Sequence, residues 1–143
     1  MALVEKTVLL PYSAAQMYKL VDDVQDYPKF LPWCGGTEVA LLQDGRMRAT
    51  VHINYHQLKQ SFTTENTRVE AERIDMRLVE GPFRLLEGSW QFSALTPTAC
   101  KIAFRLNYEF SSKLLEKLVG PVFHMIASTF VEAFIKQAEK VYK

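Results

Sequence analysis

The sequence predicts an α+β domain in which a curved, seven-stranded antiparallel sheet wraps around one long C-terminal helix. Apolar residues recur with period two from about residue 37 to residue 110, which is typical of strands with one dry face. From Ser111 onward they recur with the period of a helix. No segment between the strands is long enough for a crossover, so consecutive strands are expected to pair as a meander. All 143 residues are expected to form a single domain, 1–143.

The N-terminal segment predicts a strand followed by two short helices. Residues 3–10 are rich in Val, Leu and Thr, and a proline ends this first strand. Ser13 with Gln16 three positions later matches a capping box, and apolar residues at helical spacing extend the helix to about Val24. The next segment, Tyr27–Gly36, contains two prolines and two glycines. It is therefore expected to form a compact loop or a helical turn.

Turn signals divide the central region into strands. Asp44-Gly45 predicts a hairpin turn, and Gly81-Pro82 and Thr96-Pro97-Thr98 punctuate the later runs. The clearest alternation places Met47, Ala49, Val51, Ile53 and Tyr55 on one face. Further strands are centred on Phe62, Met76, Trp90 and Phe104. These runs account for the strands that follow the N-terminal helices.

The C-terminal helix has an apolar face wider than a surface helix needs, so the sheet must largely cover it. Gly120-Pro121 interrupts its pattern, and the helix is expected to kink there or to begin afresh. Its first turn and the Tyr27–Gly36 loop are predicted to form the lid of an apolar pocket. The longest uncharged run, Leu118–Val131, has 14 residues, fewer than the roughly 20 of a membrane-spanning helix, so no transmembrane segment is expected.

Charge and cysteine content exclude several classes of protein. Seventeen Lys and Arg residues against sixteen Asp and Glu residues leave a net charge of +1 with the signs interspersed, so DNA binding is not expected. Between residues 45 and 105 there are nine basic and six acidic residues, an excess too slight to demonstrate RNA binding. Because Cys34 and Cys100 are far apart and the N-terminus lacks a signal pattern, a reducing cytoplasm is the expected location.

The histidines are weak candidates for chemistry. His52 and His56 are four apart on a predicted strand, a separation of roughly 13 Å that is too long for one shared metal ion. Both are interpreted as surface residues. His124 lies within the apolar helix, where two interpretations are open: it reaches the cavity, or it is partly buried and satisfied by a hydrogen bond. We favour the second.

The other polar candidates favour structural roles. No neighbour that would lower the pKa of Cys34 is evident, so this residue is assigned to packing. Ser89 lacks the flanking glycine spacing of a nucleophile elbow. Asp22, Asp23 and Asp26 are expected to be solvated charges rather than a metal cluster. No catalytic residue, metal ligand or cofactor is predicted, and the protein is expected not to be an enzyme.

Several fragments in a characteristic order resemble one known family. They are Pro11-Tyr12-Ser13-Ala14, Val24–Pro28 with Phe30–Cys34, Gly81-Pro82-Phe83, Gly88–Phe92, Tyr108-Glu109-Phe110, Ala133-Phe134 and Val141-Tyr142. Across essentially the whole chain they are similar to the coenzyme Q-binding and polyketide cyclase-like branch of the START-related proteins, and within it to bacterial ribosome association toxins. The resemblance implies the START-like helix-grip fold.

The resemblance also implies a choice of roles. The leading hypothesis is a non-enzymatic carrier of a hydrophobic small molecule, ubiquinone or a related isoprenoid lipid, that supports respiration. The alternative is a toxin that binds the large ribosomal subunit and blocks its association with the small one. A remote alternative is an enzyme of the polyketide cyclase or aromatase type. The missing presequence favours a bacterial protein of the cytoplasm, which as a quinone carrier would work at the periphery of the inner membrane through transient contact with the membrane surface.

The predicted ligand site combines the lid with the dry faces of the sheet and the helix. Two tyrosines, Tyr55 and Tyr108, are proposed to meet a quinone headgroup, while Phe and Ile side chains hold an isoprenoid tail. Its members are Tyr27, Phe30, Leu31, Trp33, Val51, Ile53, Tyr55, Phe62, Met76, Trp90, Phe92, Phe104, Tyr108, Val122, Phe123, Ile126 and Phe130.

Overall fold

A computed structural model describes residues 2–142. In chain order its elements are β1 (Ala2–Leu10), α1 (Ala14–Asp22), the 3₁₀ helix η1 (Val24–Lys29), β2 (Cys34–Leu41), β3 (Met47–Tyr55), β4 (Leu58–Val69), β5 (Arg73–Glu80), β6 (Phe83–Thr96), β7 (Ala99–Phe110) and α2 (Lys113–Val141).

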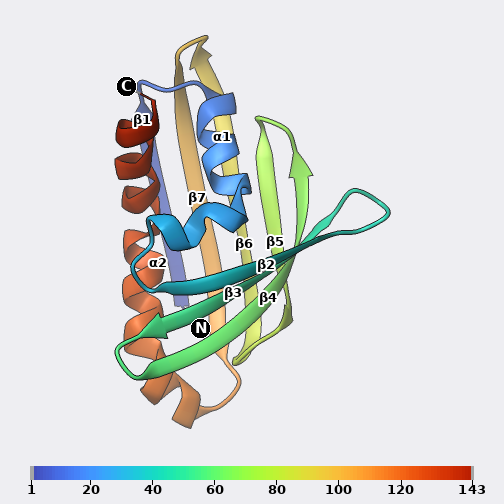
Figure 1. The fold of residues 1–143 in the computed structure, drawn as a ribbon, viewed down its shortest axis with the longest axis vertical. Coiled ribbons are helices and arrows are strands. Elements are labelled where there is room, and N and C mark those ends of the chain that lie inside the picture. Colours follow the sequence, from blue (N-terminus) through green and yellow to red (C-terminus); the bar gives the residue numbers. More distant parts are fainter. Residues whose placement is uncertain (1, 143) are drawn as a thin grey trace.

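The strands form one antiparallel sheet in the order β1-β7-β6-β5-β4-β3-β2 (Figure 1). From β2 to β7 each strand pairs with the next along the chain, which confirms the predicted meander. The first strand lies beside the last, with Ala2 opposite Tyr108 and Leu10 opposite Cys100. The long β2–β3 hairpin projects from the body of the molecule (Figure 1). Strong twist and this projecting edge give the sheet its curved inner face.

The N-terminal helices form as their sequence signals indicate. The Ser13 hydroxyl accepts a hydrogen bond from the Gln16 backbone, and the Gln16 side chain accepts one from the Ser13 backbone, so the capping box is complete. The α-helix ends at Asp22, two residues before the predicted end. The Tyr27–Gly36 segment then begins with the end of η1, which includes Pro28, and continues into β2.

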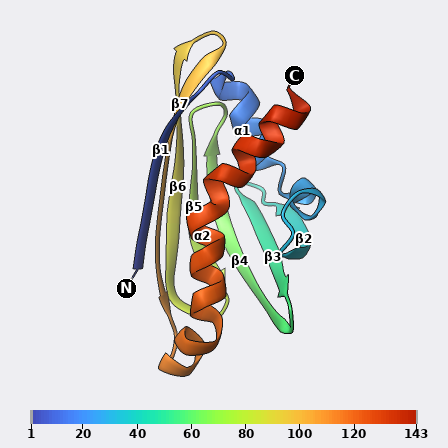
Figure 2. The ribbon, with the colours of Figure 1, turned by 90° about the vertical axis from the view of Figure 1, so that its left-hand side faces the viewer.

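The long helix α2 lies along the concave face of the sheet (Figure 2). Ser112 caps its start by accepting a hydrogen bond from the Leu115 backbone. The helix continues through Pro121, so the predicted fresh start is wrong. It bends near its beginning instead, as Figure 2 shows. A proline removes one backbone hydrogen bond, which here falls in the exposed first turns where a bend is tolerated.

One face of α2 supplies most of the contact between helix and sheet. Val119, Phe123, Ile126, Val131 and Phe134 are all buried on it. By length and composition α2 is also apolar enough to cross a membrane, although a core helix of a soluble protein passes the same test. In this structure its inner face is occupied by the sheet.

The core contains two groups of aromatic rings. Near α1, Trp90 of β6 is fully buried and packs on Phe130 and Phe134 of α2, with ring centroids 5.7 and 5.4 Å apart. Toward the other end, Phe83 and Phe123 lie 4.8 Å apart. Rings in such edge-to-face contact contribute beyond their buried area, so each group is a rigid anchor for helix and sheet.

The predicted solvated aspartates separate into two kinds. Asp23 pairs with Lys19 and Asp26 with Lys29 at the exposed surface. For Asp22 the prediction is wrong, because its carboxylate lies against Arg68 of β4 at 2.9 Å and is largely shielded from solvent. Asp22 and Arg68 are 46 residues apart in the sequence, so no local pattern indicated this contact.

Candidate ligand-binding site

A small internal cavity lies between α2 and the sheet, between the two aromatic groups. Its volume is about 70 Å³, and its wall is almost wholly apolar. The lining residues are Val24, Tyr27, Trp33, Ala49, Val51, Phe62, Thr64, Asn66, Met76, Leu86, Phe104, Leu106, Phe123, Ile126, Ala127 and Phe130. The wall therefore comes from η1, the following loop, strands β3 to β7 and α2.

The structure brings nine of the predicted site residues to this cavity. They are Tyr27, Trp33, Val51, Phe62, Met76, Phe104, Phe123, Ile126 and Phe130. The period-two and period-3.6 patterns placed these residues on inward faces, and curvature of the sheet then gathered them. From the predicted lid, Tyr27 and Trp33 contribute. The first turn of α2 does not, because every α2 residue of the wall follows Pro121.

The other eight predicted residues lie outside the cavity wall. They are Phe30, Leu31, Ile53, Tyr55, Trp90, Phe92, Tyr108 and Val122. Trp90 and Phe92 face inward as predicted, but they fill the space beneath α1, where Phe92 packs on Tyr18 at 5.7 Å. Phe30 packs on Phe134 at 5.4 Å. An inward face is thus necessary for lining the cavity, but the packing of α1 and η1 decides which part of that face stays uncovered.

The proposed headgroup contacts are wrong in this structure. The half-buried Tyr55 lies at the end of β3 with its ring 4.3 Å from that of His56. The Tyr108 hydroxyl forms a 3.2 Å hydrogen bond with His124 Nδ1 on the flank of α2. Burial raises the pKa of Tyr108 above its usual value. Neither hydroxyl lies at the cavity.

Sequence reasoning missed the polar part of the wall. Thr64 and Asn66 of β4 are only 6% and 4% exposed, and the Thr64 hydroxyl donates a 2.8 Å hydrogen bond to Asn66 Oδ1. They follow Phe62 at period two, so they share its inward face. This period-two spacing from Phe62 could have identified Thr64 and Asn66 as inward-facing residues from the sequence alone. The remaining missed positions are aliphatic: Val24, Ala49, Leu86, Leu106 and Ala127.

One further hydroxyl at the cavity is already engaged. Tyr27 of η1 is buried, and its hydroxyl donates a hydrogen bond to the Val21 carbonyl at the end of α1. Burial, reinforced by the Asp22 charge, raises the pKa of Tyr27 far above its usual value. The Tyr27 hydroxyl therefore stays protonated and fixes η1 against α1.

The cavity is small for a ligand site. Sites for drug-sized molecules enclose roughly 300–1,000 Å³, and an engineered apolar cavity of about 150 Å³ holds benzene. At about 70 Å³ the present space is half of that. An isoprenoid quinone would enter only if parts of the wall moved outward.

The histidines lie outside the cavity. His52 is on the outer face of β3, where Nδ1 bonds the Ser61 hydroxyl at 2.6 Å and Nε2 bonds a Glu38 carboxylate oxygen at 2.9 Å. The residues from 2 to 142 contain no cluster of three potential metal ligands. His124 is exposed and does not line the cavity, so the interpretation that it reaches the cavity is wrong. The interpretation that it is partly buried is wrong about burial, but the hydrogen bond that it expected is present, to the Tyr108 hydroxyl.

The two cysteines are buried, unpaired thiols. Cys34 Sγ lies 3.5 Å from the Gly36 carbonyl oxygen, and Cys100 is fully buried in β7. Burial raises the pKa of both thiols, which keeps them protonated and unreactive. This geometry agrees with the packing role predicted for Cys34.

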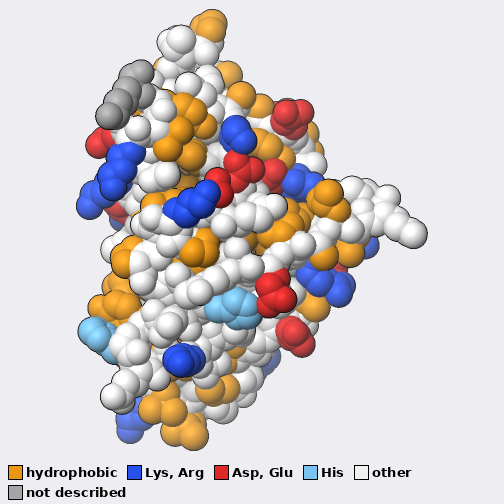
Figure 3. All heavy atoms as spheres, viewed as in Figure 1, with side chains coloured by type: hydrophobic (Ala, Val, Ile, Leu, Met, Phe, Trp, Pro, Cys, Tyr) orange, Lys and Arg blue, Asp and Glu red, His pale blue; other side chains and the backbone are white. Residues whose placement is uncertain are grey.

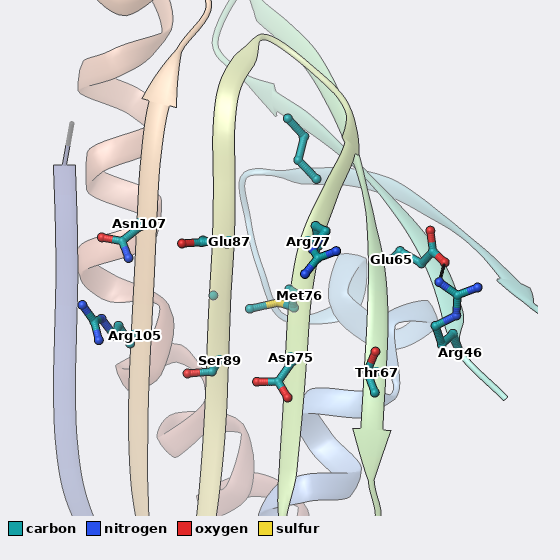
Figure 4. Close-up of a pocket in the computed structure, with 12 residues that line it drawn as sticks. Arg46, Glu65, Thr67, Asp75, Met76, Arg77, Glu87, Ser89, Arg105 and Asn107 are labelled. Atoms are coloured by element: carbon teal, nitrogen blue, oxygen red, sulfur yellow. Dashed lines mark ion pairs between the residues drawn. The ribbon is translucent and has the colours of Figure 1, made fainter. Parts of the chain in front are cut away.

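A second, larger hollow of about 630 Å³ lies on the outer face of β4 to β7 (Figure 4). Its side chains form cross-strand rows in which charges alternate: Glu65 lies opposite Arg77, and Arg77 opposite Glu87. Arg46 and Arg48 both pair with Glu65. The visible face of the molecule likewise mixes positive and negative side chains (Figure 3). Such rows stabilise a sheet and do not form a patch of one sign.

Comparison with known proteins agrees with the fold. Residues 10–135 match the family described as "Polyketide cyclase / dehydrase and lipid transport". The "Ribosome association toxin RatA" of Escherichia coli (strain K12) is 44% identical over 97% of this chain and 88% of its own length.

Two further proteins show the breadth of the family. The mitochondrial "Coenzyme Q-binding protein COQ10 homolog B" of Xenopus laevis is 30% identical over 94% of this chain, which spans 57% of that protein. A solved START superfamily protein from Mycobacterium smegmatis superposes with a TM-score of 0.76 at 22% identity, covering 97% of this chain and 98% of that one. The predicted START-like helix-grip fold is therefore confirmed. The chain belongs to the polyketide cyclase / dehydrase and lipid transport family.

Proposed function

We propose that this protein acts as a ribosome association factor of the RatA kind, which binds the large ribosomal subunit and blocks its joining with the small one. This proposal rests mainly on the 44% identity to the Escherichia coli toxin over 97% of the chain. The cavity volume of about 70 Å³ supports a role exercised through the surface rather than through a large enclosed ligand. This reverses the order of the two hypotheses drawn from the sequence.

We further propose that the protein is not an enzyme and works in the cytoplasm. Its cavity presents an amide and a hydroxyl from Asn66 and Thr64, neither of which titrates near neutral pH. Tyr27, whose pKa is raised, is engaged with the Val21 carbonyl. Acid–base catalysis needs a group that gains or loses a proton near the working pH, and the described wall offers none.

The experiment for the ribosomal role is overproduction followed by sucrose-gradient sedimentation. The expected result is a smaller peak of joined ribosomes, larger peaks of free subunits, and sedimentation of the protein with the large subunit. An unchanged ratio of joined to free subunits would contradict the proposal. Because the cavity should not matter for this role, a cavity-filling variant serves as an internal control.

A second function is supported by a separate observation. The apolar cavity and the 30% identity to a coenzyme Q-binding protein favour a carrier of an apolar small molecule, with ubiquinone as the first candidate. Its test is extraction of the purified protein with organic solvent and mass spectrometry. Protein from a quinone-making host is expected to release a quinone or isoprenoid lipid. Absence of any lipid, together with failure to load one, would count against this function.

A further inference from the structure

The inner face of β4 carries the polar groups of an otherwise apolar cavity. Phe62, Thr64 and Asn66 alternate along the strand and all line the cavity. Rings of Phe104 and Phe123 and the thioether of Met76 belong to the same wall. A polar pair at this place costs free energy relative to two apolar side chains, because its groups are removed from water. Such a pair therefore calls for a partner.

The hydrogen bond inside the pair determines what kind of partner fits. The Thr64 hydroxyl donates to Asn66 Oδ1, which occupies the amide oxygen and orients the amide plane. The amide nitrogen carries two N–H donors, and no residue from 2 to 142 accepts a hydrogen bond from it. The pair thus offers donors to the cavity. A ligand that complements it must supply an acceptor oxygen.

We propose that Asn66, oriented by Thr64, is a specificity-determining residue that hydrogen-bonds the carbonyl oxygen of a compact apolar ligand held in the cavity. The ligand class is a ketone or quinone whose carbon skeleton contacts the aromatic wall. This inference rests on the second proposed function, binding of an apolar molecule, and is independent of the ribosomal role. It replaces Tyr55 and Tyr108 as the polar contacts of the site.

Met76 supplies the space that such a ligand requires. Met76 belongs to the lining of both the internal cavity and the outer hollow, so this part of β5 separates the two spaces (Figure 4). Because Met76 lies opposite Asn66 in the β4–β5 pairing, the two side chains share the inward face. A Cβ placed on Gly88 would lie 2.9 Å from Met76 Cε, which means that the methyl group packs directly on the bare backbone of β6. Methionine is unbranched and adapts its rotamers readily. A rotamer change that withdraws this one side chain from the cavity enlarges the space beside Asn66, which Met76 faces across the β4–β5 pairing.

The test compares two probes of nearly equal shape. Acetophenone carries a carbonyl oxygen, and isopropylbenzene carries a methyl group in its place. Binding of each to the full-length protein is followed by two-dimensional NMR titration, with the Asn66 side-chain amide as the direct reporter. Wild-type protein is expected to bind the ketone roughly five- to tenfold more tightly than the hydrocarbon, the ratio that one buried neutral hydrogen bond supplies.

Three variants separate the outcomes. Asn66→Leu keeps an apolar wall and is expected to abolish the preference or to reverse it toward the hydrocarbon, because the ketone oxygen is then buried without a donor, while hydrocarbon binding persists. Thr64→Val keeps the Asn66 amide but removes the hydrogen bond that orients it. The preference for the ketone is therefore expected to lie between those of the wild type and Asn66→Leu. Thr63→Val is the matched control, because Thr63 is also buried but bonds Thr50 away from the cavity.

Each result bears on the proposal in a defined way. An undiminished ketone preference in Asn66→Leu, or an unmoved Asn66 amide signal during the wild-type titration, would overturn the assignment of Asn66 while leaving apolar ligand binding intact. Failure of both probes to bind the wild-type protein would overturn the ligand function and the site together. Thermal unfolding checks that Asn66→Leu remains folded, and Thr64→Val supplies the second test if it does not.

Discussion

Arg68 of β4 holds both carboxylate oxygens of Asp22, at 2.9 and 3.1 Å, and so attaches the end of α1 to the sheet. The same guanidinium donates to the Gly45 carbonyl in the β2–β3 turn at 3.3 Å. Its side chain is 21% exposed and that of Asp22 is 18% exposed. One arginine thus joins the helix, the hairpin tip and β4. Because α1 leads directly into η1 and Tyr27, this contact also positions one wall of the cavity.

Arg68→Ala is expected to lower the free energy of unfolding by about 2 kcal/mol, since it leaves the Asp22 carboxylate partly buried without its partner. Urea denaturation measures this change. The matched control is Lys19→Ala, which removes an exposed ion pair with Asp23 and should change stability by less than about 0.5 kcal/mol. Equal effects of the two substitutions would show that the Arg68 contact is no stronger than a surface pair.

Ala127→Leu is expected to fill the cavity. Ala127 is buried on α2 and lines the space, and the added carbons occupy most of about 70 Å³. Ketone and hydrocarbon probes should then fail to bind in the NMR titration, while sedimentation with the large ribosomal subunit is unchanged. Ala133→Leu, on the same helix but outside the cavity wall, is the control. Loss of ribosome association in Ala127→Leu alone would link the cavity to the ribosomal role.

Alkaline pH is expected to destabilise the protein through Tyr27. Burial raises the pKa of Tyr27 in the folded state, so the unfolded chain loses the Tyr27 proton first, near the usual tyrosine pKa of 10.0. The stabilising contribution is complete below about pH 10 and falls as pH rises beyond it. Urea midpoints between pH 8 and 11.5 should therefore decrease above pH 10. In Tyr27→Phe the midpoint should be lower at pH 8, because the bond to Val21 is lost, and should decrease less steeply with pH.

Arg77 and Arg105 are the two exposed arginines of the outer hollow for which no ion pair is found within residues 2–142. If this face meets ribosomal RNA, their guanidinium groups are suited to phosphate oxygens. The double substitution Arg77→Ala and Arg105→Ala should then weaken association with the large subunit and reduce its salt dependence. Arg84→Ala, on the same face but paired with Glu109, is the control. Unchanged association of the double variant would exclude this face.

The sequence predicted the fold because its signals are local. Period-two alternation located the strands, Ser13 and Gln16 marked the start of α1, and Asp44-Gly45 marked a hairpin that the structure contains. These signals depend on backbone geometry within a few residues, which tertiary packing rarely overrides. The meander then followed from the short connections.

The site was predictable only in part because it depends on long-range packing. An inward position such as Trp90 or Phe104 looks the same in the sequence, yet Trp90 is covered by aromatic rings of α2 while Phe104 meets the cavity. The bond between Asp22 and Arg68 spans 46 residues and left no local pattern. Asn66 was overlooked although its spacing from Phe62 placed it on the inner face. Polar residues at inward strand positions are therefore the signal to examine first.

The ribosomal role is tested most directly by reassociating purified ribosomal subunits in the presence of the purified protein and separating them by sucrose-gradient sedimentation. Wild-type protein and Ala127→Leu are both expected to reduce the peak of joined ribosomes in a dose-dependent manner, with the protein bound to the large subunit. Full joining of the subunits at a several-fold molar excess of folded protein would contradict the proposed function.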